Sequence, residues 1–361
     1  MKYFSMFSGV GGFELGIQRA MEQISLLQER QEEERDTGNE YNEIERSKRY
    51  SGQSSTTSNI KEASGERDTE SRSDVPNINR ESSTHWRSEP STCVGVCEWY
   101  KYSSIVLEKR FPGVKNYGDA TTIKTDELPD FDMLVGGFPC QTFSIAGNRA
   151  GFDDTRGTMF FEIVRVLKAK RPEYCVLENV KGLLSHDKGK TFLTILSTLQ
   201  ELGYNVEWGV LNSRYFGVPQ NRERVFIIGR LRERGRSKVF PLRIGNGQGN
   251  KTSEFKVSNA SPREFGFKDY CPCMVARDYK EPKIVKNDVS IRRLTPVECE
   301  RLQGFPDAWT LVKMPNDKMM SNSQRYKMMG NAVTVNVVQA IMEKLFEFRR
   351  SFKEKIENEK K

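Results

Sequence analysis

Short apolar runs alternate with helical patterns along most of this chain. The strand-like runs cover residues 3–7, 93–99, 131–137, 174–179, 205–212 and 224–229. The helical patterns begin near Phe13 and then cover residues 101–111, 158–169 and 190–202. Strands that alternate with helices are typical of α/β domains, in which the helices connect neighbouring strands of one sheet. The sequence therefore predicts an α/β fold with a mainly parallel sheet.

Two stretches interrupt this alternation. Residues 22–95 are charged and rich in Ser and Thr, with 10 basic and 16 acidic residues. Such a segment buries too little apolar surface to offset its ordering entropy, so we expect a largely disordered polar insert. Residues 231–290 gain Gly, Pro, Lys and Arg, which indicates a second, smaller domain. The C-terminal segment, 291–361, contains a helical pattern near 295–303 and a long one from about Ala332.

Charge and cysteine content limit the classes of function. The net charge is +8, and because residues 22–95 carry −6, the rest of the chain carries +14. A basic body favours a polyanionic partner such as nucleic acid. No apolar run approaches the roughly 20 residues that span a bilayer, and no secretory signal is recognisable, so we expect a cytoplasmic protein without a membrane partner. Seven cysteines without a regular framework fit a reducing compartment, and the isolated pair Cys271 and Cys273 predicts no metal site.

A glycine-rich turn, SGVGG at 8–12, joins the first strand to the first helix. Glycines let a ligand approach the backbone, and a helix N-terminus offers unpaired N–H groups. Glu14 stands where a dinucleotide fingerprint has its third glycine, so a plain tight turn is an open alternative. Glu98 ends the second strand, where a carboxylate accepts hydrogen bonds from ribose hydroxyls. With Trp99 to stack on a purine and Asp119 at the same edge, the pattern favours an adenosine-containing ligand.

The stretch GGFPCQTFSIAG, residues 136–147, holds Cys140 in a short non-helical turn after an apolar run. A nucleophilic thiol needs a nearby base or a lowered pKa. The chain has two histidines, and His85 lies in the low-complexity insert, so a Cys–His hydrolase is poorly supported. Glu178 ends a neighbouring strand, where a glutamate with a raised pKa could donate a proton to a ring nitrogen. Arg222 and Arg224 begin a further strand and suit a carbonyl oxygen, a carboxylate or a phosphate.

Eight segments in this order resemble the DNA (cytosine-5)-methyltransferase family. They are FSGVGGFELG (7–16), CEW (97–99), YGDAT (117–121), GGFPCQTFSIAG (136–147), ENVKG (178–182), PQNRERVFIIG (219–229), RRLTPVECERLQGFPD (292–307) and GNAVTVNVVQAI (330–341). The resemblance covers nearly the whole chain except the insert and part of 231–290. It implies a doubly wound, Rossmann-like fold of the S-adenosyl-L-methionine-dependent methyltransferase type.

The resemblance also implies a mechanism. Cys140 would attack carbon 6 of a cytosine flipped out of duplex DNA, and Glu178 would protonate or hydrogen-bond ring nitrogen 3. Arg224 with Arg222 would hold the base oxygen and the catalytic loop, while Gln141 and Ser144 lie on the loop that closes over DNA. S-adenosyl-L-methionine would be the methyl donor. The residues that would line its pocket are Phe7, Gly9, Gly11, Glu98, Trp99, Asp119, Pro139, Asn331 and Val333.

Domain roles and partners follow from the same resemblance. Residues 1–21 and 96–230 would form the catalytic and cofactor-binding domain, 231–290 the small target-recognition domain, and the helix from about Ala332 would return to the catalytic domain. The expected partner is double-stranded DNA, with a monomeric enzyme from a restriction-modification system or prophage and a cognate restriction endonuclease as a functional partner. Tyr100, where an aspartate is common, and Cys273, at a frequent threonine position, depart from the family pattern.

Three alternatives stay open on the sequence. An RNA cytosine methyltransferase on the same scaffold would share Cys140 and Glu178. A catalytically inactive DNA-binding homologue would lack Cys140, Glu178 or Arg224, and all three are present. A dehydrogenase is disfavoured by the missing third glycine. The recognised DNA sequence is not predicted.

Overall fold

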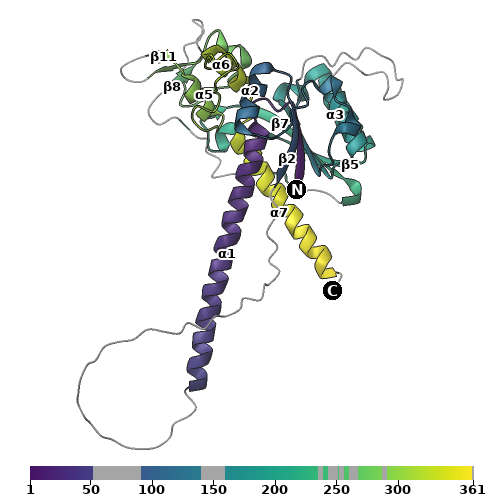
Figure 1. Cartoon of the computed structure of the whole chain (residues 1–361), viewed down its shortest axis with the longest axis vertical. Coiled ribbons are helices and arrows are strands. Elements are labelled where there is room, and N and C mark those ends of the chain that lie inside the picture. The colour runs from purple at the N-terminus through teal and green to yellow at the C-terminus, as the bar shows by residue number, and fades with distance from the viewer. Residues whose placement is uncertain are drawn as a thin grey trace, which may run out of the picture. The chain divides into compact units, whose positions relative to one another are not determined.

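The computed structural model of the protein describes residues 1–51, 91–139, 159–234, 239–242, 251, 256–259, 267–286 and 291–359. The chain divides into two units, one formed by Met1–Gln23 with Pro90–Lys361 and the other by Ile24–Glu89. The first unit contains the sheet and the sites described below (Figure 1).

The first unit is built on a six-stranded sheet of mainly parallel strands, as the sequence predicts. In spatial order the strands are β2 (Thr92–Cys97), β1 (Lys2–Met6), β3 (Met133–Gly137), β4 (Tyr174–Val180), β7 (Glu223–Leu231) and β5 (Tyr204–Asn212). The first four run parallel to one another, and β7 is antiparallel to both of its neighbours. The prediction of an α/β fold with a mainly parallel sheet is confirmed.

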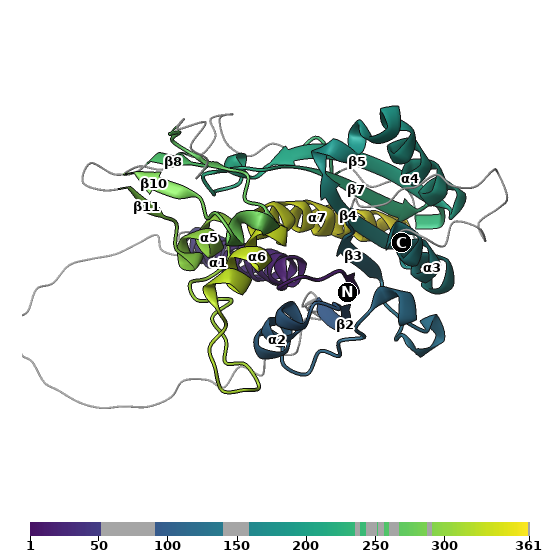
Figure 2. The same cartoon turned by 90° about the horizontal axis from the view of Figure 1, so that it is seen from above.

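Helices cover both faces of this sheet, because successive side chains of a strand point to opposite faces. Residues such as Leu134 and Leu177 face a core that contains apolar residues of α3 (Met159–Lys170) and α4 (Lys190–Glu201). Their neighbours Val135 and Val176 face a second core, shared with the beginning of α1 (Gly12–Ser51) and with α7 (Val335–Glu359). Figure 2 shows α7 lying along the sheet on the side away from α3.

A third apolar cluster joins α2 (Lys101–Arg110) to the C-terminal half of the unit. It contains residues of α5 (Pro296–Leu302) and α6 (Asn322–Asn331) and of a small antiparallel sheet. That sheet has the order β11 (Ile291–Arg293), β10 (Ile284–Lys286) and β8 (Lys256–Ser258), and β6 (Gln220–Asn221) pairs with β9 (Cys271–Pro272).

Short 3₁₀ helices connect several of these elements. They are η1 (Ala120–Thr122), η2 (Thr125–Glu127), η3 (Lys181–Leu184), η4 (His186–Gly189), η5 (Ser213–Tyr215), η6 (Arg232–Arg234) and η7 (Ala276–Tyr279). None of the helices that the structure describes is long and apolar enough to cross a lipid bilayer.

The structure corrects the sequence prediction over residues 22–51, which are helical as the continuation of α1. The prediction of disorder rested on the lack of an apolar stripe. However, Glu, Gln, Arg and Lys have high intrinsic helix propensities, and no proline interrupts this stretch. A polar helix can therefore satisfy its backbone hydrogen bonds without an apolar stripe. Residues 52–90 of the predicted insert lie outside the described residues.

Arg230 anchors α7 to the sheet. Its side chain is buried, and Nη2 lies 3.1 Å from Oε1 of Glu173, the residue directly before β4. The guanidinium also lies over the rings of Tyr174, Phe348 and Phe352, at 5.4, 5.3 and 4.6 Å from their centroids. Because Phe348 and Phe352 belong to α7, the cation holds that helix against β4 and β7.

We expect Arg230→Ala to lower the free energy of unfolding by about 3–5 kcal/mol, because it removes one partner of a buried ion pair and the contact with α7. Arg232→Ala is the matched control, since Arg232 is exposed and donates to the Gln200 carbonyl at 2.7 Å. Urea titration of both variants measures the difference. An equal, small loss in both variants would contradict the anchoring role.

Candidate active site

The carboxyl ends of the parallel strands bring the predicted residues to one edge of the sheet. From β1 the chain reaches β2 on one side, whereas β3 pairs with β1 on the other side. Such a point of divergence is where open α/β sheets bind their ligands. The glycine turn follows β1, Glu98 follows β2, and Glu178 lies near the end of β4.

The turn after β1 is tied to the end of β2. The backbone N–H groups of Phe7 and Ser8 both donate to the Cys97 carbonyl, at 2.8 and 3.3 Å. Phe7 adopts a positive φ of 57°, which is uncommon for a residue with a side chain and marks a sharply defined turn. Gly9 follows, also with a positive φ, and a Cβ at Gly9 would meet no atom within 4 Å. The turn is therefore open on that side, as a backbone that a ligand approaches must be.

Glu98 closes the turn from the second strand. Its Oε2 accepts from the Gly9 N–H at 2.8 Å, and its Oε1 accepts from the Tyr100 N–H at 2.7 Å. Burial raises the pKa of this carboxyl group, and the two N–H donors partly oppose that rise. Each carboxylate oxygen has a second lone pair, so Glu98 keeps acceptor capacity for ribose hydroxyls while it holds the turn.

Aromatic and acidic groups surround the same edge. Trp99 is 72% exposed, an unusual degree for so large an apolar side chain, so its ring is available for stacking. Asp119 accepts from the backbone N–H and the hydroxyl of Thr121, both at 2.9 Å, which fixes the beginning of η1. Tyr100 donates its hydroxyl to Gln324 of α6. The departure from the family pattern at Tyr100 therefore makes a contact with α6.

The segment between α6 and α7 lies against the glycine turn. A Cβ at Gly12 would come within 2.6 Å of Cγ1 of Val333, so Val333 packs directly over this glycine. Asn331 is exposed at the end of α6. The structure thus brings Phe7, Gly9, Gly11, Glu98 and Val333 to one neighbourhood.

Glu178 and Arg224 form an ion pair at the end of β4. Arg224 Nε lies 2.9 Å from Glu178 Oε1, and both side chains are 13% exposed. Glu178 is opposite Phe226 on β7, so Arg224 is its diagonal neighbour on the same face. Burial raises the pKa of Glu178, and the charges of Arg224 and Arg222 act in the opposite direction. A carboxyl group in this setting can bind a proton and pass it to a base.

The strand before the predicted nucleophile is shaped around Glu178. Gly137 is paired with Glu178 in register, and a Cβ at Gly137 would lie 2.9 Å from Glu178 Oε2. The glycine therefore leaves room for the carboxylate. Asn179 donates from Nδ2 to the buried Phe138 carbonyl at 2.9 Å, which fixes the chain just before Pro139. Pro139 is exposed, and Cys140, Gln141 and Ser144 lie outside the described residues.

Arg222 has a different environment from Arg224. Its guanidinium is buried and donates to three backbone carbonyls, those of Met274 at 2.7 Å, Gly330 at 3.2 Å and Ala332 at 2.7 Å. Burial and the nearby charge of Arg224 lower the pKa of Arg222 to about 10. Cys273, the other departure from the family pattern, lies 3.6 Å from Arg222 Nη1 and 3.9 Å from Arg224 Nη1.

Sequence reasoning missed Asn179, although its position directly after Glu178 in ENVKG was a usable signal. It also gave no role to Glu14, which lies fully buried beneath the glycine turn. Among the described residues, neither carboxylate oxygen of Glu14 has a hydrogen-bond partner. Burial raises the pKa of Glu14 to about 7, and the nearby Ser5 and Ser8 hydroxyls oppose that rise only in part.

Comparison with known proteins identifies the family. The family model for C-5 cytosine-specific DNA methylases matches residues 80–266 and 246–347. The chain belongs to this family. It is 40% identical over 271 residues to the Type II methyltransferase M1.ScrFI of Lactococcus lactis subsp. cremoris, a match that covers 65% of this chain and 67% of the relative. It is 37% identical over 283 residues to M.NlaX of Neisseria lactamica, covering 70% and 88% of the two chains.

Solved structures agree on the fold. The S. pombe Dnmt2 methyltransferase superposes with a TM-score of 0.61 at 18% identity, covering 96% of this chain and 98% of that one. A putative DNA modification methyltransferase from an E. coli prophage gives 0.56 at 15% identity, with coverages of 97% and 99%. The protein is thus a DNA (cytosine-5)-methyltransferase that uses S-adenosyl-L-methionine, and DNA is favoured over the RNA alternative. The open turn at Gly9, the exposed Trp99 ring and the carboxylate of Glu98 fit that methyl donor.

We expect Glu14→Gln to change how the stability of the methyltransferase depends on pH. The raised pKa means that folded Glu14 keeps its proton up to about pH 7, whereas the unfolded chain loses it above about pH 4.5. Stability is therefore lost as the pH rises from 4.5 to 7, by about 3 kcal/mol in total. Relative to wild type, Glu14→Gln should become more stable across this window in urea titrations. A difference independent of pH would contradict the buried, protonated state.

Substitutions of Arg222 and Arg224 should affect different properties, the first mainly the stability of the protein and the second mainly methyl transfer. Arg222→Met leaves three backbone carbonyls without their donor, so we expect a loss of about 3 kcal/mol or more in unfolding free energy. Arg224→Met, the matched variant two residues away, leaves Glu178 without its cation but able to take up a proton, because burial already raises its pKa. We therefore expect a smaller loss of stability than in Arg222→Met, together with loss of methyl transfer. Thermal unfolding and single-turnover kinetics measure the two effects. The reverse pattern would contradict the assignment.

Proposed function

We propose that the protein methylates carbon 5 of cytosine within a specific short duplex DNA sequence, by covalent catalysis through Cys140. The observation that carries this proposal is the buried Glu178–Arg224 pair. It lies in register with Gly137, three residues before the cysteine, on the adjacent strand. A thiol and a proton-holding carboxyl group are thereby assigned to neighbouring strand ends.

Each chemical step has a residue assigned to it. The Cys140 thiolate forms a bond to carbon 6 of the flipped base, and the electrons of the 5,6 double bond move toward ring nitrogen 3 and the base oxygen. Protonated Glu178 donates its proton to ring nitrogen 3, which its raised pKa favours. Arg224 holds the carboxylate that remains and hydrogen-bonds the base oxygen. Carbon 5 is now nucleophilic enough to be methylated.

When bound, S-adenosyl-L-methionine would supply the methyl group from its sulfonium sulfur, with the thioether as the leaving group. The proton on carbon 5 then passes through a base in the site to water, and the bond between carbon 6 and sulfur breaks to restore the 5,6 double bond. Glu178 recovers its proton from ring nitrogen 3, and Cys140 leaves as the thiolate. No net redox change occurs, and the enzyme returns to its starting state.

The methyl donor is held at the divergence of β1 and β3. We assign the ribose hydroxyls to Glu98 and the adenine face to Trp99, with Phe7, Asp119 and Pro139 around them. Gly9 and Gly11 provide the open backbone, and Asn331 with Val333 closes the pocket from the C-terminal segment. Gln141 and Ser144 contact the DNA.

Arg222 supports the site from behind. Because its guanidinium is committed to the Met274, Gly330 and Ala332 carbonyls, we assign it a positioning role. It joins the beginning of β7, which carries Arg224, to the segment that carries Asn331 and Val333.

Target recognition is assigned to residues 231–290, next to the catalytic domain formed by 1–21 and 96–230. The small sheet of β8, β10 and β11 presents exposed basic residues from this range, among them Lys256 and Lys286. Basic side chains on a compact sheet suit the phosphate backbone and base edges of duplex DNA. We infer a monomeric, cytoplasmic enzyme of a restriction-modification system or prophage, with a cognate endonuclease as functional partner, since the relatives are named Type II methyltransferases.

We expect Cys140→Ala to fold and to bind duplex DNA and S-adenosyl-L-methionine, yet to transfer no methyl group. Carbon 5 of cytosine is too weak a nucleophile until a group adds at carbon 6. The wild-type enzyme should form a covalent adduct with DNA that carries 5-fluorocytosine, because fluorine cannot leave as a cation. A denaturing gel with peptide mapping tests this.

Cys299→Ala is the matched control, because Cys299 is buried in α5 among the apolar residues of the third cluster. Methyl transfer by Cys140→Ala, or an adduct that maps to Cys175 or Cys299, would overturn the assignment. A wild-type protein that gives neither adduct nor product would favour the inactive homologue.

A further inference from the structure

Asn116 lies beside the outer edge of β2, in a segment that no motif covers. Residues 115–117 extend the sheet there, because the Val96 N–H donates to the Lys115 carbonyl at 2.9 Å and the Tyr117 N–H donates to the Val96 carbonyl at 2.8 Å. Val96 and Asn116 are partners in this isolated parallel bridge. The bridge brings the Asn116 side chain to the backbone of Glu98, two residues beyond Val96.

The carboxamide of Asn116 makes four hydrogen bonds there. Oδ1 accepts from the backbone N–H groups of Glu98 and Gly118, each at 3.0 Å. Nδ2 donates to the Glu98 carbonyl at 3.0 Å and to the Ser104 hydroxyl oxygen at 3.2 Å. Both donors and both acceptor sites of the amide are therefore used. The atom that faces the two backbone N–H groups must be the amide oxygen, because an NH₂ group cannot accept from them. Only this orientation of the amide forms all four hydrogen bonds.

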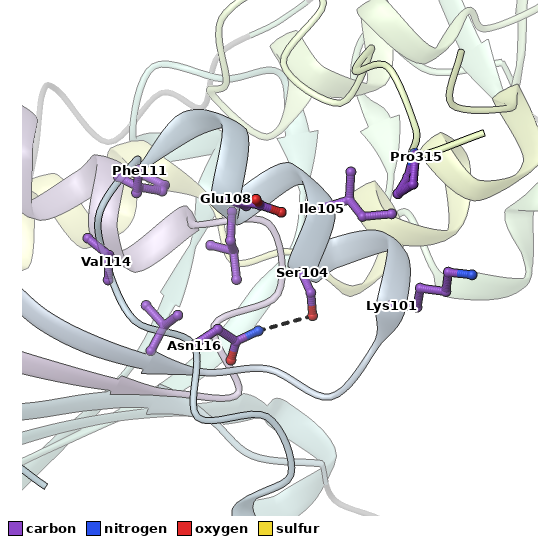
Figure 3. A pocket seen from close by; sticks show the side chains of 10 residues that line it. Lys101, Ser104, Ile105, Glu108, Phe111, Val114, Asn116 and Pro315 are labelled. Atoms are coloured by element: carbon purple, nitrogen blue, oxygen red, sulfur yellow. Dashed lines mark hydrogen bonds between the residues drawn. The ribbon is translucent and has the colours of Figure 1, made fainter. Parts of the chain in front are cut away.

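Ser104 completes the arrangement from the first turn of α2. Its hydroxyl lies 3.0 Å from the Glu98 carbonyl and 3.2 Å from the Tyr100 carbonyl. The same hydroxyl accepts a hydrogen bond from Asn116 (Figure 3). The backbone of Glu98 is consequently held at its N–H by Asn116 and at its carbonyl by both Asn116 and Ser104. Gly118, the other partner of Asn116, precedes Asp119 directly.

Asn116 and Ser104 also border a cavity beside α2. This cavity has a volume of about 410 Å³ and lies between α2 and the end of β2. Trp99, Asp119 and Glu178 do not line this cavity, so it is separate from the proposed donor pocket. Glu98 does not line the cavity either, and its backbone is held on this side by the hydrogen bonds from Asn116 and Ser104.

We propose that Asn116, assisted by Ser104, is a positioning residue for methyl-donor binding. Its amide fixes the position of Glu98 relative to the turn that carries Asp119. The inference rests on the proposed roles of Glu98 and Asp119 in the donor pocket. Glu98 and Asp119 lie on segments separated by α2, so each would otherwise move with its own loop. One amide that binds the backbone beside both residues makes the two side chains a single preformed site.

The experiment measures the dissociation constant of S-adenosyl-L-methionine by calorimetry. Losing these hydrogen bonds should weaken binding by about 5- to 30-fold in Asn116→Ala. Asn116→Asp should be at least as weak, because a carboxylate oxygen would face the Glu98 carbonyl and add negative charge beside Glu98. Ser104→Ala should weaken binding less, in the same direction. Asn316→Ala is the matched control, since Asn316 is exposed in a turn and accepts from the Lys318 N–H.

Two further readouts distinguish positioning from loss of folding. The KM for the methyl donor should rise, while kcat at saturating donor and the KM for DNA stay within about twofold of wild type. Asn116→Ala should also be combined with Glu98→Ala. In that background, the change that Asn116→Ala causes in the logarithm of the donor dissociation constant should be half or less of its change in the wild-type background, because Asn116 acts partly through Glu98. Should Asn116→Ala fail to fold, Asn116→Asp and Ser104→Ala carry the same test.

The outcomes separate this inference from the proposed function. Glu98→Ala with unchanged donor affinity removes Glu98 from the pocket and overturns both. Weakened binding in Glu98→Ala with unchanged binding in Asn116→Ala overturns the positioning role alone. An effect of Asn116→Ala that persists undiminished in the Glu98→Ala background also overturns it.

Discussion

The buried pair of Glu178 and Arg224 sets the requirements for the rest of the active site. A carboxylate taken out of water is costly unless a cation or a proton accompanies it. Arg224 reaches Glu178 because β7 runs antiparallel to β4, which places Arg224 opposite Val180 and diagonal to Glu178. Gly137 on the other neighbouring strand leaves the room that the carboxylate occupies. The antiparallel strand β7 thus supplies Arg224, the cation that accompanies the Glu178 carboxylate.

A chain of buried hydrogen bonds connects the strand that carries Arg224 to the segment proposed to close the donor pocket. Arg222 reaches the carbonyls of Gly330 and Ala332, and Gln303 reaches that of Met329 at 2.8 Å. Thr334 donates to Gln303 at 2.7 Å and lies 2.8 Å from the Ser213 hydroxyl. The segment between α6 and α7 is therefore held to the strand that carries Arg224. In the proposed mechanism, base chemistry and donor binding share this support, as preorganised catalysis requires.

The sequence predicted the sheet and its polar strand ends well, because short continuous apolar runs and glycine turns are local signals. Glu98 and Glu178 were found since each directly ends such a run. The helix over 22–51 was missed because a polar helix leaves no apolar stripe, and α6 was missed for the same reason. Arg222 and Asn116 act through backbone groups distant in sequence, such as Ala332 and Glu98, which no local pattern identifies. The two domains proposed from the sequence stay a prediction.

The family, the fold and the position of Glu178 together assign methyl transfer to carbon 5 of cytosine. The most direct measurement uses duplex DNA labelled with tritium at carbon 5 of cytosine and S-adenosyl-L-methionine labelled with carbon-14 in its methyl group. The account predicts one tritium released to water for each methyl group incorporated, because the hydrogen on carbon 5 must leave before the thiolate does. Methyl incorporation without tritium release would place the methyl group on another atom and would contradict the account.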